Sequence, residues 1–155
     1  MTREEQRNRV ICSCIQQQEH IANIAKQEMD SAQQQSNDYG ANVDRYDSYR
    51  TKMMRSRDMY ARQLANAQSG MRVLQDLLRL PPFDAVEHGA CVVTDKQRFF
   101  LSIGAGKFVV STPGSPTEVW FAISAQTPIY AALKGCMVGD TIVFNGQAQT
   151  IKEIF

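Results

Sequence analysis

The first half of the sequence contains no proline and almost no glycine. All five prolines lie at or after Pro81, and the only glycines before that point are Gly40 and Gly70. Because these two residue types interrupt helices, their scarcity permits long continuous helices before residue 81. The residues found there are mainly Gln, Arg, Glu, Ala, Met and Leu, most of which favour the helix.

The chain also lacks an excess of charge of either sign. Seventeen Lys and Arg oppose sixteen Asp and Glu, which leaves a formal charge of +1. Such a balance provides no general attraction to a nucleic-acid backbone. We therefore expect no sequence-specific DNA binding, and we expect any partner to be recognised through local patches.

Long apolar runs and paired cysteines are missing as well. No run approaches the roughly 18 apolar residues that indicate a membrane span, and residues 1–6 are too polar for a signal peptide. Cys12 and Cys14 are two residues apart, which is not the spacing of a CxxC redox or zinc pair. We expect a cytoplasmic protein without a membrane partner.

The composition changes at Pro81-Pro82. Seven of the nine glycines and many β-branched and aromatic residues follow this point, which favours strands and turns. The expected fold class is α+β, with a helical hairpin over 1–80, a linker over 81–85 and a β-rich domain over 86–155.

A seven-residue repeat runs along the second expected helix. Such a repeat is typical of a coiled-coil seam, and the turn formers at 36–43 predict that two helices pair as an antiparallel hairpin. On the first helix, the expected seam residues are Val10, Ile11, Cys14, Ile15, Ile21, Ile24, Ala25, Met29 and Ala32. On the second helix, the expected seam positions are Tyr46, Met53, Tyr60, Ala67 and Leu74, with Arg50, Arg57, Leu64, Met71 and Leu78 beside them.

The second half predicts a twisted antiparallel sheet packed on one short helix. Asn145-Gly146 predicts a hairpin turn, and residues 104–106 are also expected to form one. Thr127, Pro128 and Gly135 suit the cap, first residue and end of a helix over 128–134. The expected strands are 90–94, 98–103, 107–110, 118–124, 141–145 and 149–155.

Residues 123–140 carry a dense motif. They follow the pattern I-S-x-x-[ST]-P-I-x-x-A-L-x-G-x-x-V-G-D, which resembles the signature of the C-terminal domain of the GreA/GreB transcription elongation factors. That family has an N-terminal antiparallel coiled coil and a C-terminal FKBP-like domain, so the resemblance extends to the order of the two halves.

The resemblance implies a non-enzymatic partner of bacterial RNA polymerase. The C-terminal domain would dock at the polymerase secondary channel, and we assign that role to the motif residues Thr127, Pro128, Ile129, Gly139 and Asp140. The coiled coil would enter the channel, where two acids at its tip help the polymerase hold Mg²⁺ for cleavage of backtracked RNA. No intrinsic cofactor and no stably bound metal are expected.

The tip is where this sequence departs from the family. Asp44 and Asp47 keep the three-residue spacing of the family's acids, with Asp38 as the next candidate. The asparagine of the family motif is absent, and its Glu is replaced by Asp47. An alternative is that Asp44 and Asp47 only cap a helix, as acids commonly do near a helix start.

Basic side chains crowd the start of the second helix. Arg45, Arg50 and Arg57 are candidates for contact with nascent RNA or with the channel walls. The alternative is a solvated helix face with pairs such as Asp58 and Arg62.

Three further functions stay open at this point. A channel-binding inhibitor would share the fold but would not stimulate cleavage. A prolyl isomerase would follow only from analogy with the FKBP-like fold, with aromatic residues such as Trp120 and Tyr130 around a pocket. A scaffold would use the coiled coil to dimerise. Cys91 and His88 lie close in sequence but lack the third group of a nucleophilic site, which favours a core role for Cys91.

Overall fold

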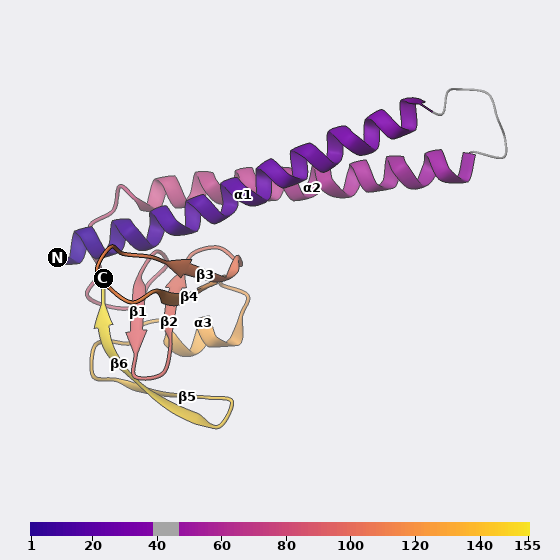
Figure 1. The fold of residues 1–155 in the computed structure, drawn as a ribbon. Helices are drawn as coiled ribbons and strands as arrows, with labels where there is room; N and C mark the ends of the chain where they lie inside the picture. The colour runs from indigo at the N-terminus through magenta and orange to yellow at the C-terminus, as the bar shows by residue number, and fades with distance from the viewer. Residues whose placement is uncertain (39–46) are drawn as a thin grey trace. The chain divides into compact units, whose positions relative to one another are not determined.

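Two long helices make up the first half of the chain in the computed structural model, which describes residues 1–38 and 47–155. Helix α1 spans Arg3–Asp38 and α2 spans Asp47–Leu77 (Figure 1). Helix α1 begins with a capping box: Thr2 N donates to Glu5 Oε2 at 2.8 Å, and Glu5 N donates to Thr2 Oγ1 at 3.1 Å. No helix in the described ranges is long and apolar enough to cross a membrane.

The chain divides into two compact units whose limits lie inside the helices. Residues 1–17 and 72–155 form one unit, here called the sheet unit, and residues 18–71 form the other, the hairpin unit. This division differs from the boundary that the sequence predicted at 81–85. The first turns of α1 and the last turns of α2 belong with the sheet, because their apolar side chains are part of its core.

The hairpin unit is an antiparallel pair of helices with a seam of small residues. Gln35 of α1 accepts a hydrogen bond from the Tyr49 hydroxyl of α2 at 3.3 Å, and Ala22 and Leu64 share one groove nearer the other end of the unit. On α1, the buried positions repeat with the spacing of a heptad. The buried residues of this unit are Gln18, Ala22, Ala25, Ala32, Ser36, Ala67 and Gly70.

The predicted seam is confirmed at Ala25, Ala32, Ala67 and Leu74 and is wrong at Ile21 and Ile24. Ile21 and Ile24 are 37% and 45% exposed, and Ala22 takes the seam position instead. A shift of one residue along a helix turns a side chain by about 100°, so the small residue faces α2 and the isoleucines flank it. In the sheet unit the same correction applies to α2, where Leu77 is fully buried and the predicted Leu78 only partly.

A six-stranded sheet forms the centre of the sheet unit, in the order β3-β4-β2-β1-β6-β5. All six predicted strands are confirmed, and α3 spans Pro128–Leu133. The strands are β1 Cys91–Thr94, β2 Arg98–Leu101, β3 Gly106–Val110, β4 Glu118–Ile123, β5 Thr141–Phe144 and β6 Gln147–Ile154. The predicted Asn145-Gly146 turn joins β5 to β6, with positive φ at both residues.

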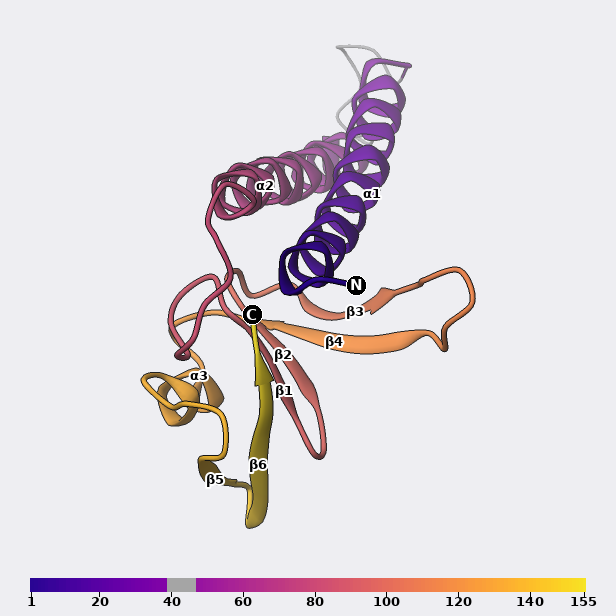
Figure 2. The same cartoon turned by 90° about the vertical axis from the view of Figure 1, so that its left-hand side faces the viewer.

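The sheet is mixed, which corrects the prediction of an antiparallel sheet. Strand β4 pairs in parallel with β2, through Phe99 with Phe121 and Leu101 with Ile123, and antiparallel with β3. Residues 104–106 therefore do not form the predicted hairpin, because β4 lies between the two strands that they connect. Figure 2 shows β3 and β4 running together beside β2.

Each face of the sheet has its own apolar core. Phe100, Phe108 and Trp120 face one core, which Ile11 of α1 and Leu74 of α2 complete. The opposite core includes Val92, Leu101 and Ile151, and α3 covers it with Ile129, Tyr130 and Leu133. The structure therefore has an α+β architecture, and a specifically FKBP-like fold stays a prediction.

Arg7 of α1 is fully buried although it carries a charge. Arg7 Nη2 donates to the Leu77 carbonyl at 2.9 Å, and Nη1 donates to the Gly89 carbonyl. The guanidinium also lies 5.0 Å from the centre of the Phe83 ring, a cation–π distance. No carboxylate pairs with Arg7 among the described residues, and burial lowers the pKa of its guanidinium from the ordinary value.

We predict that Leu133→Ala destabilises the protein by about 2–5 kcal/mol, because it opens a cavity under α3. Leu133 is completely buried in the second core. Urea denaturation measures the change. Val143→Ala is the control, since Val143 is 70% exposed and a surface change of this kind costs less than about 0.5 kcal/mol. Equal midpoints for wild type and Leu133→Ala would show that α3 does not pack on the sheet.

We also predict that Arg7→Met lowers the free energy of unfolding by about 1–3 kcal/mol, because two buried carbonyls lose a charged donor. Arg7→Lys should lose a similar amount, since one ammonium cannot reproduce the planar fork of donors. Arg72→Met, at an exposed position of α2, is the control. If Arg7→Met is as stable as wild type, the cost of burying the charge offsets its hydrogen bonds.

Candidate functional site

Two of the predicted acids are the end residues of the helices in the hairpin unit. Asp38 is the last residue of α1 and Asp47 the first of α2, while Asp44 lies outside the described residues. The side chains of all three acids are likewise outside the description. Among the residues that are described, no three metal-ligating side chains form a cluster. The role of these acids with Mg²⁺ stays a prediction.

The motif of residues 123–140 spans the end of β4, helix α3 and the turn into β5. Thr127 is the N-cap of α3 and Pro128 its first residue, as predicted. The Thr127 hydroxyl, however, makes no bond to the helix and instead donates to the Ser124 carbonyl at 2.8 Å. Gly135 follows the helix with a φ of +83°, which glycine adopts without steric cost. These motif residues therefore define one helix and its two ends.

The second part of the motif builds a tight turn before β5. Asp140 Oδ2 accepts a hydrogen bond from Met137 N at 2.8 Å, and Gly139 N donates to the Ile151 carbonyl at 2.9 Å. Gly139 has a φ of +94°. The Asp140 carboxylate thus closes the turn, while the residue itself stays exposed.

The five predicted docking residues do not share one environment. Ile129 is only 7% exposed and packs in the second core, so its side chain stabilises the domain and does not reach a partner. Pro128, Gly139 and Asp140 are exposed, and Thr127 is half-buried. A docking role remains open for these four residues.

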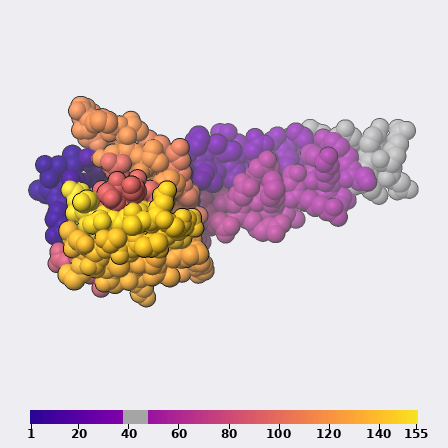
Figure 3. Space-filling model, turned by 90° about the horizontal axis from the view of Figure 1, so that it is seen from below, coloured from indigo at the N-terminus to yellow at the C-terminus, as the bar shows by residue number. Residues whose placement is uncertain are grey.

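An exposed apolar group beside this turn was missed. Met137 and Val138 are 54% and 57% exposed, and Val143 on β5 is 70% exposed. Val138 belongs to the V-G-D end of the motif, but the sequence pattern gives no sign that its side chain points outward. Figure 3 shows the face of the sheet unit on which the β5–β6 segment, in yellow, meets solvent.

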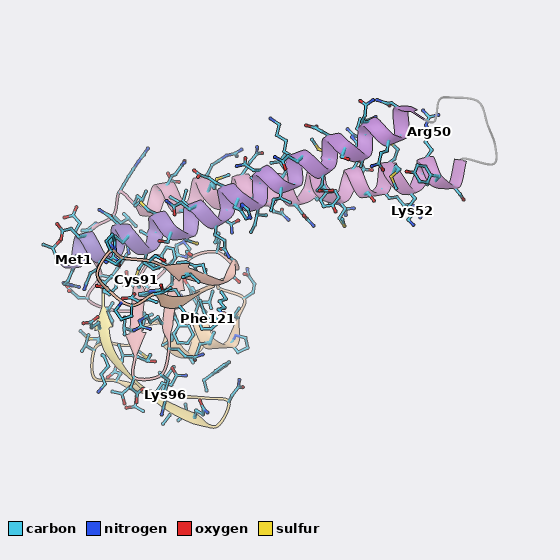
Figure 4. The ribbon with its side chains drawn as sticks, viewed as in Figure 1. Met1, Arg50, Lys52, Cys91, Lys96 and Phe121 are labelled. Atoms are coloured by element: carbon cyan, nitrogen blue, oxygen red, sulfur yellow. The ribbon has the colours of Figure 1, made fainter. Side chains whose placement is uncertain are left out.

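The basic side chains of α2 lie in different settings. Arg45 is outside the described residues, and Arg50 is exposed near the start of α2, as is Lys52 (Figure 4). Arg57 Nη1 lies 3.4 Å from Asp58 Oδ1. The expected pair of Asp58 and Arg62 takes another form, in which Arg62 Nε donates to the Asp58 carbonyl at 3.5 Å. Lys52 and Arg55 line a shallow concavity with Ser48, Tyr49 and Thr51.

The sheet unit contains the residues of two alternative sites, a Cys91–His88 pair and an aromatic pocket, and most of these residues are buried in the cores. Cys91 is fully buried, and burial raises the pKa of its thiol to about 12, which removes the thiolate that a nucleophile requires. His88 is exposed. Trp120 and Tyr130 are buried in the two cores, and Trp120 Nε1 donates to Glu118 Oε2 at 2.9 Å. These aromatic rings fill cores and do not line an open pocket.

Comparisons with protein-family models, with curated proteins and with solved structures return no match to this chain.

Proposed function

We propose that this protein binds bacterial RNA polymerase and modulates the cleavage of backtracked RNA. In this proposal the sheet unit docks at the secondary channel, and the helical hairpin enters the channel with its tip toward the polymerase active site. The protein contributes no active site of its own and acts in the cytoplasm. The proposal rests on the motif of residues 123–140, which resembles the GreA/GreB C-terminal signature.

One observation supports the proposal most strongly. The positions that define the motif are those with specific backbone tasks: Pro128 begins α3, Gly135 follows its end, and Gly139 forms the turn into β5. A chance similarity in composition would not place each of these residue types where its backbone preference is used. The motif is therefore a structural unit, and its likeness to the family signature carries weight.

The length of the hairpin supports the second part of the proposal, which is that the hairpin enters the polymerase channel. Helices of 36 and 31 residues are each about 45–55 Å long at 1.5 Å per residue. Such a length suits a probe that reaches a buried active site. At the tip, two carboxylates alone make an incomplete Mg²⁺ site, because Mg²⁺ requires octahedral oxygen coordination. The polymerase and the RNA phosphates would have to provide the remaining ligands.

The second candidate is an inhibitor that occupies the channel without stimulating cleavage. The departure of the tip from the family motif favours this candidate: the asparagine is missing, and Asp47 stands where the family has the longer Glu. Both candidates share the docking mode and differ only in chemistry at the tip. A prolyl isomerase gains no support, since Trp120 and Tyr130 are buried.

We predict that Asp44→Asn with Asp47→Asn reduces RNA cleavage in a stalled elongation complex to the intrinsic rate of the polymerase. Binding to the polymerase should change little, because the tip carboxylates contribute only when metal and phosphates are present. Asn retains some capping ability, so the melting temperature should stay close to that of wild type. Gel analysis of the cleaved transcript and a pull-down provide the two measurements.

The matched control is Asp30→Asn, which removes an exposed carboxylate elsewhere on α1. With Asp30→Asn, transcript cleavage by the polymerase should be stimulated to the same extent as with wild type. If wild-type protein binds the polymerase but never raises cleavage above the intrinsic rate, the metal role of the tip acids is wrong and the inhibitor becomes the favoured candidate. If wild-type protein does not bind the polymerase at all, both candidates are wrong.

A further inference from the structure

A cavity of about 310 Å³ lies within the sheet unit, where the start of α1, the segment before β1 and the end of β6 come together. Val138, Ile154 and Phe155 provide its apolar lining, and Arg3, Asp84 and Glu153 are among its polar lining residues. Ligand-binding clefts span about 300–1,000 Å³. This cavity is at the small end of that range, which suits a single large side chain.

A β-bulge in β6 gives Glu153 its position. Val93 of β1 lies opposite Glu153, whereas Thr94 lies opposite Ile151, so Lys152 has no partner across the pair. An extra residue reverses the alternation of side chains beyond it. Glu153 is consequently exposed, while Ile154 remains 4% exposed in the core. Without the bulge, Glu153 and Ile154 would exchange faces of the sheet, and Ile154 would leave the second core.

The charges around the cavity do not cancel. Arg3 Nη2 donates to Asp84 Oδ1 at 3.2 Å, to the Ile154 carbonyl at 3.0 Å and to the Phe83 carbonyl. The Arg3 charge is therefore matched by Asp84. Glu153 forms no ion pair among the described residues, and the neighbouring Lys152 does not line the cavity. Among the described side chains, Glu153 is therefore a carboxylate without an ionic partner beside the apolar part of the cavity lining.

We propose that this cavity binds one apolar side chain of a protein partner, with a Lys or Arg beside it pairing with Glu153. Val138 of the cavity lining and Met137, its neighbour in sequence, are both more than half exposed, as expected of a contact that excludes water around a buried anchor. That the partner is RNA polymerase rests on the function proposed above. The chemistry of the recognised segment does not depend on it.

The first experiment uses dipeptide probes and the full-length protein. Acetyl-Leu-Arg-amide, acetyl-Leu-Glu-amide and acetyl-Ala-Arg-amide are titrated to about 10 mM, a range suited to millimolar affinities, while NMR follows the backbone amides of Val138, Ile154 and Phe155. The Leu-Arg probe should shift these amides at the lowest concentration. The Leu-Glu probe should bind up to about fivefold more weakly, the ratio that one exposed charge pair typically provides. Equal shifts from all three probes, or none, would overturn the proposal.

Charge reversal separates recognition from damage to the fold. Glu153→Lys should exchange the order of the Leu-Arg and Leu-Glu probes, a result that a merely destabilised protein does not give. Val138→Asp should abolish the shifts from both probes. Val143→Asp is the matched control, because Val143 is more exposed than Val138 and does not line the cavity. It should bind the probes as wild type does.

The second experiment tests the partner with purified bacterial core RNA polymerase in a binding titration. If wild type binds and Val138→Asp binds at least about tenfold more weakly, a loss typical of an interface anchor, while Val143→Asp is unchanged, the cavity is part of the docking surface. If all three bind equally, the cavity does not dock the polymerase, and the proposed function survives. If wild type does not bind, the proposed function fails, and the probe titration alone decides whether the cavity recognises an apolar-basic segment.

Discussion

The buried Arg7 guanidinium joins the base of the helices to the segment that leads into the sheet. Arg7 reaches the carbonyl of Leu77 at the end of α2 and the carbonyl of Gly89 just before β1. The end of a helix leaves carbonyls without partners and carries a partial negative charge, so a cation there is stabilising. The same group satisfies a buried carbonyl in the segment that leads into β1. The Arg7 side chain therefore contacts two segments that lie 70 and 82 residues further along the chain.

Position 89, whose carbonyl contacts Arg7, is poorly suited to any residue larger than glycine. A Cβ atom on Gly89 would lie 2.8 Å from Leu77 Cδ2, and Gly89 has a φ of +98°, which side chains rarely adopt. The close approach of Gly89 to Leu77 brings both carbonyls within reach of one fork of donors. Phe83 adds the face of its ring. The charge is thus stabilised by dipoles and a ring, in place of a carboxylate.

Local patterns in the sequence predicted the elements, and long-range packing decided what the patterns could not. The strands, the Asn145-Gly146 turn and the start of α3 follow from residue preferences over a few positions. The insertion of β4 between β2 and β3 depends on contacts that no local pattern records. The sequence could not show which residue of α1 faces α2 at this point, because Ala22 and Ile21 are both apolar and only the packing of α2 selects between them. Arg7 escaped notice because arginine ordinarily indicates solvent. Of the candidate site, helix α3 was predicted correctly and Ile129 is buried, whereas the docking role of the motif stays a prediction.

The place of β4 in the sheet has a consequence for the order in which the chain can fold during synthesis. Synthesis of the helices ends at Leu77. The apolar side chains at their base pack on a sheet that includes β4, and β4 ends at Ile123. At about 5–20 residues per second, ribosomes make the intervening 46 residues in roughly 2–9 s. During that interval Ile11 and Leu74 lack the β4 residues, such as Trp120, that pack with them in the folded protein. A chaperone that holds apolar helices would find its substrate in this window, before the sheet closes over them.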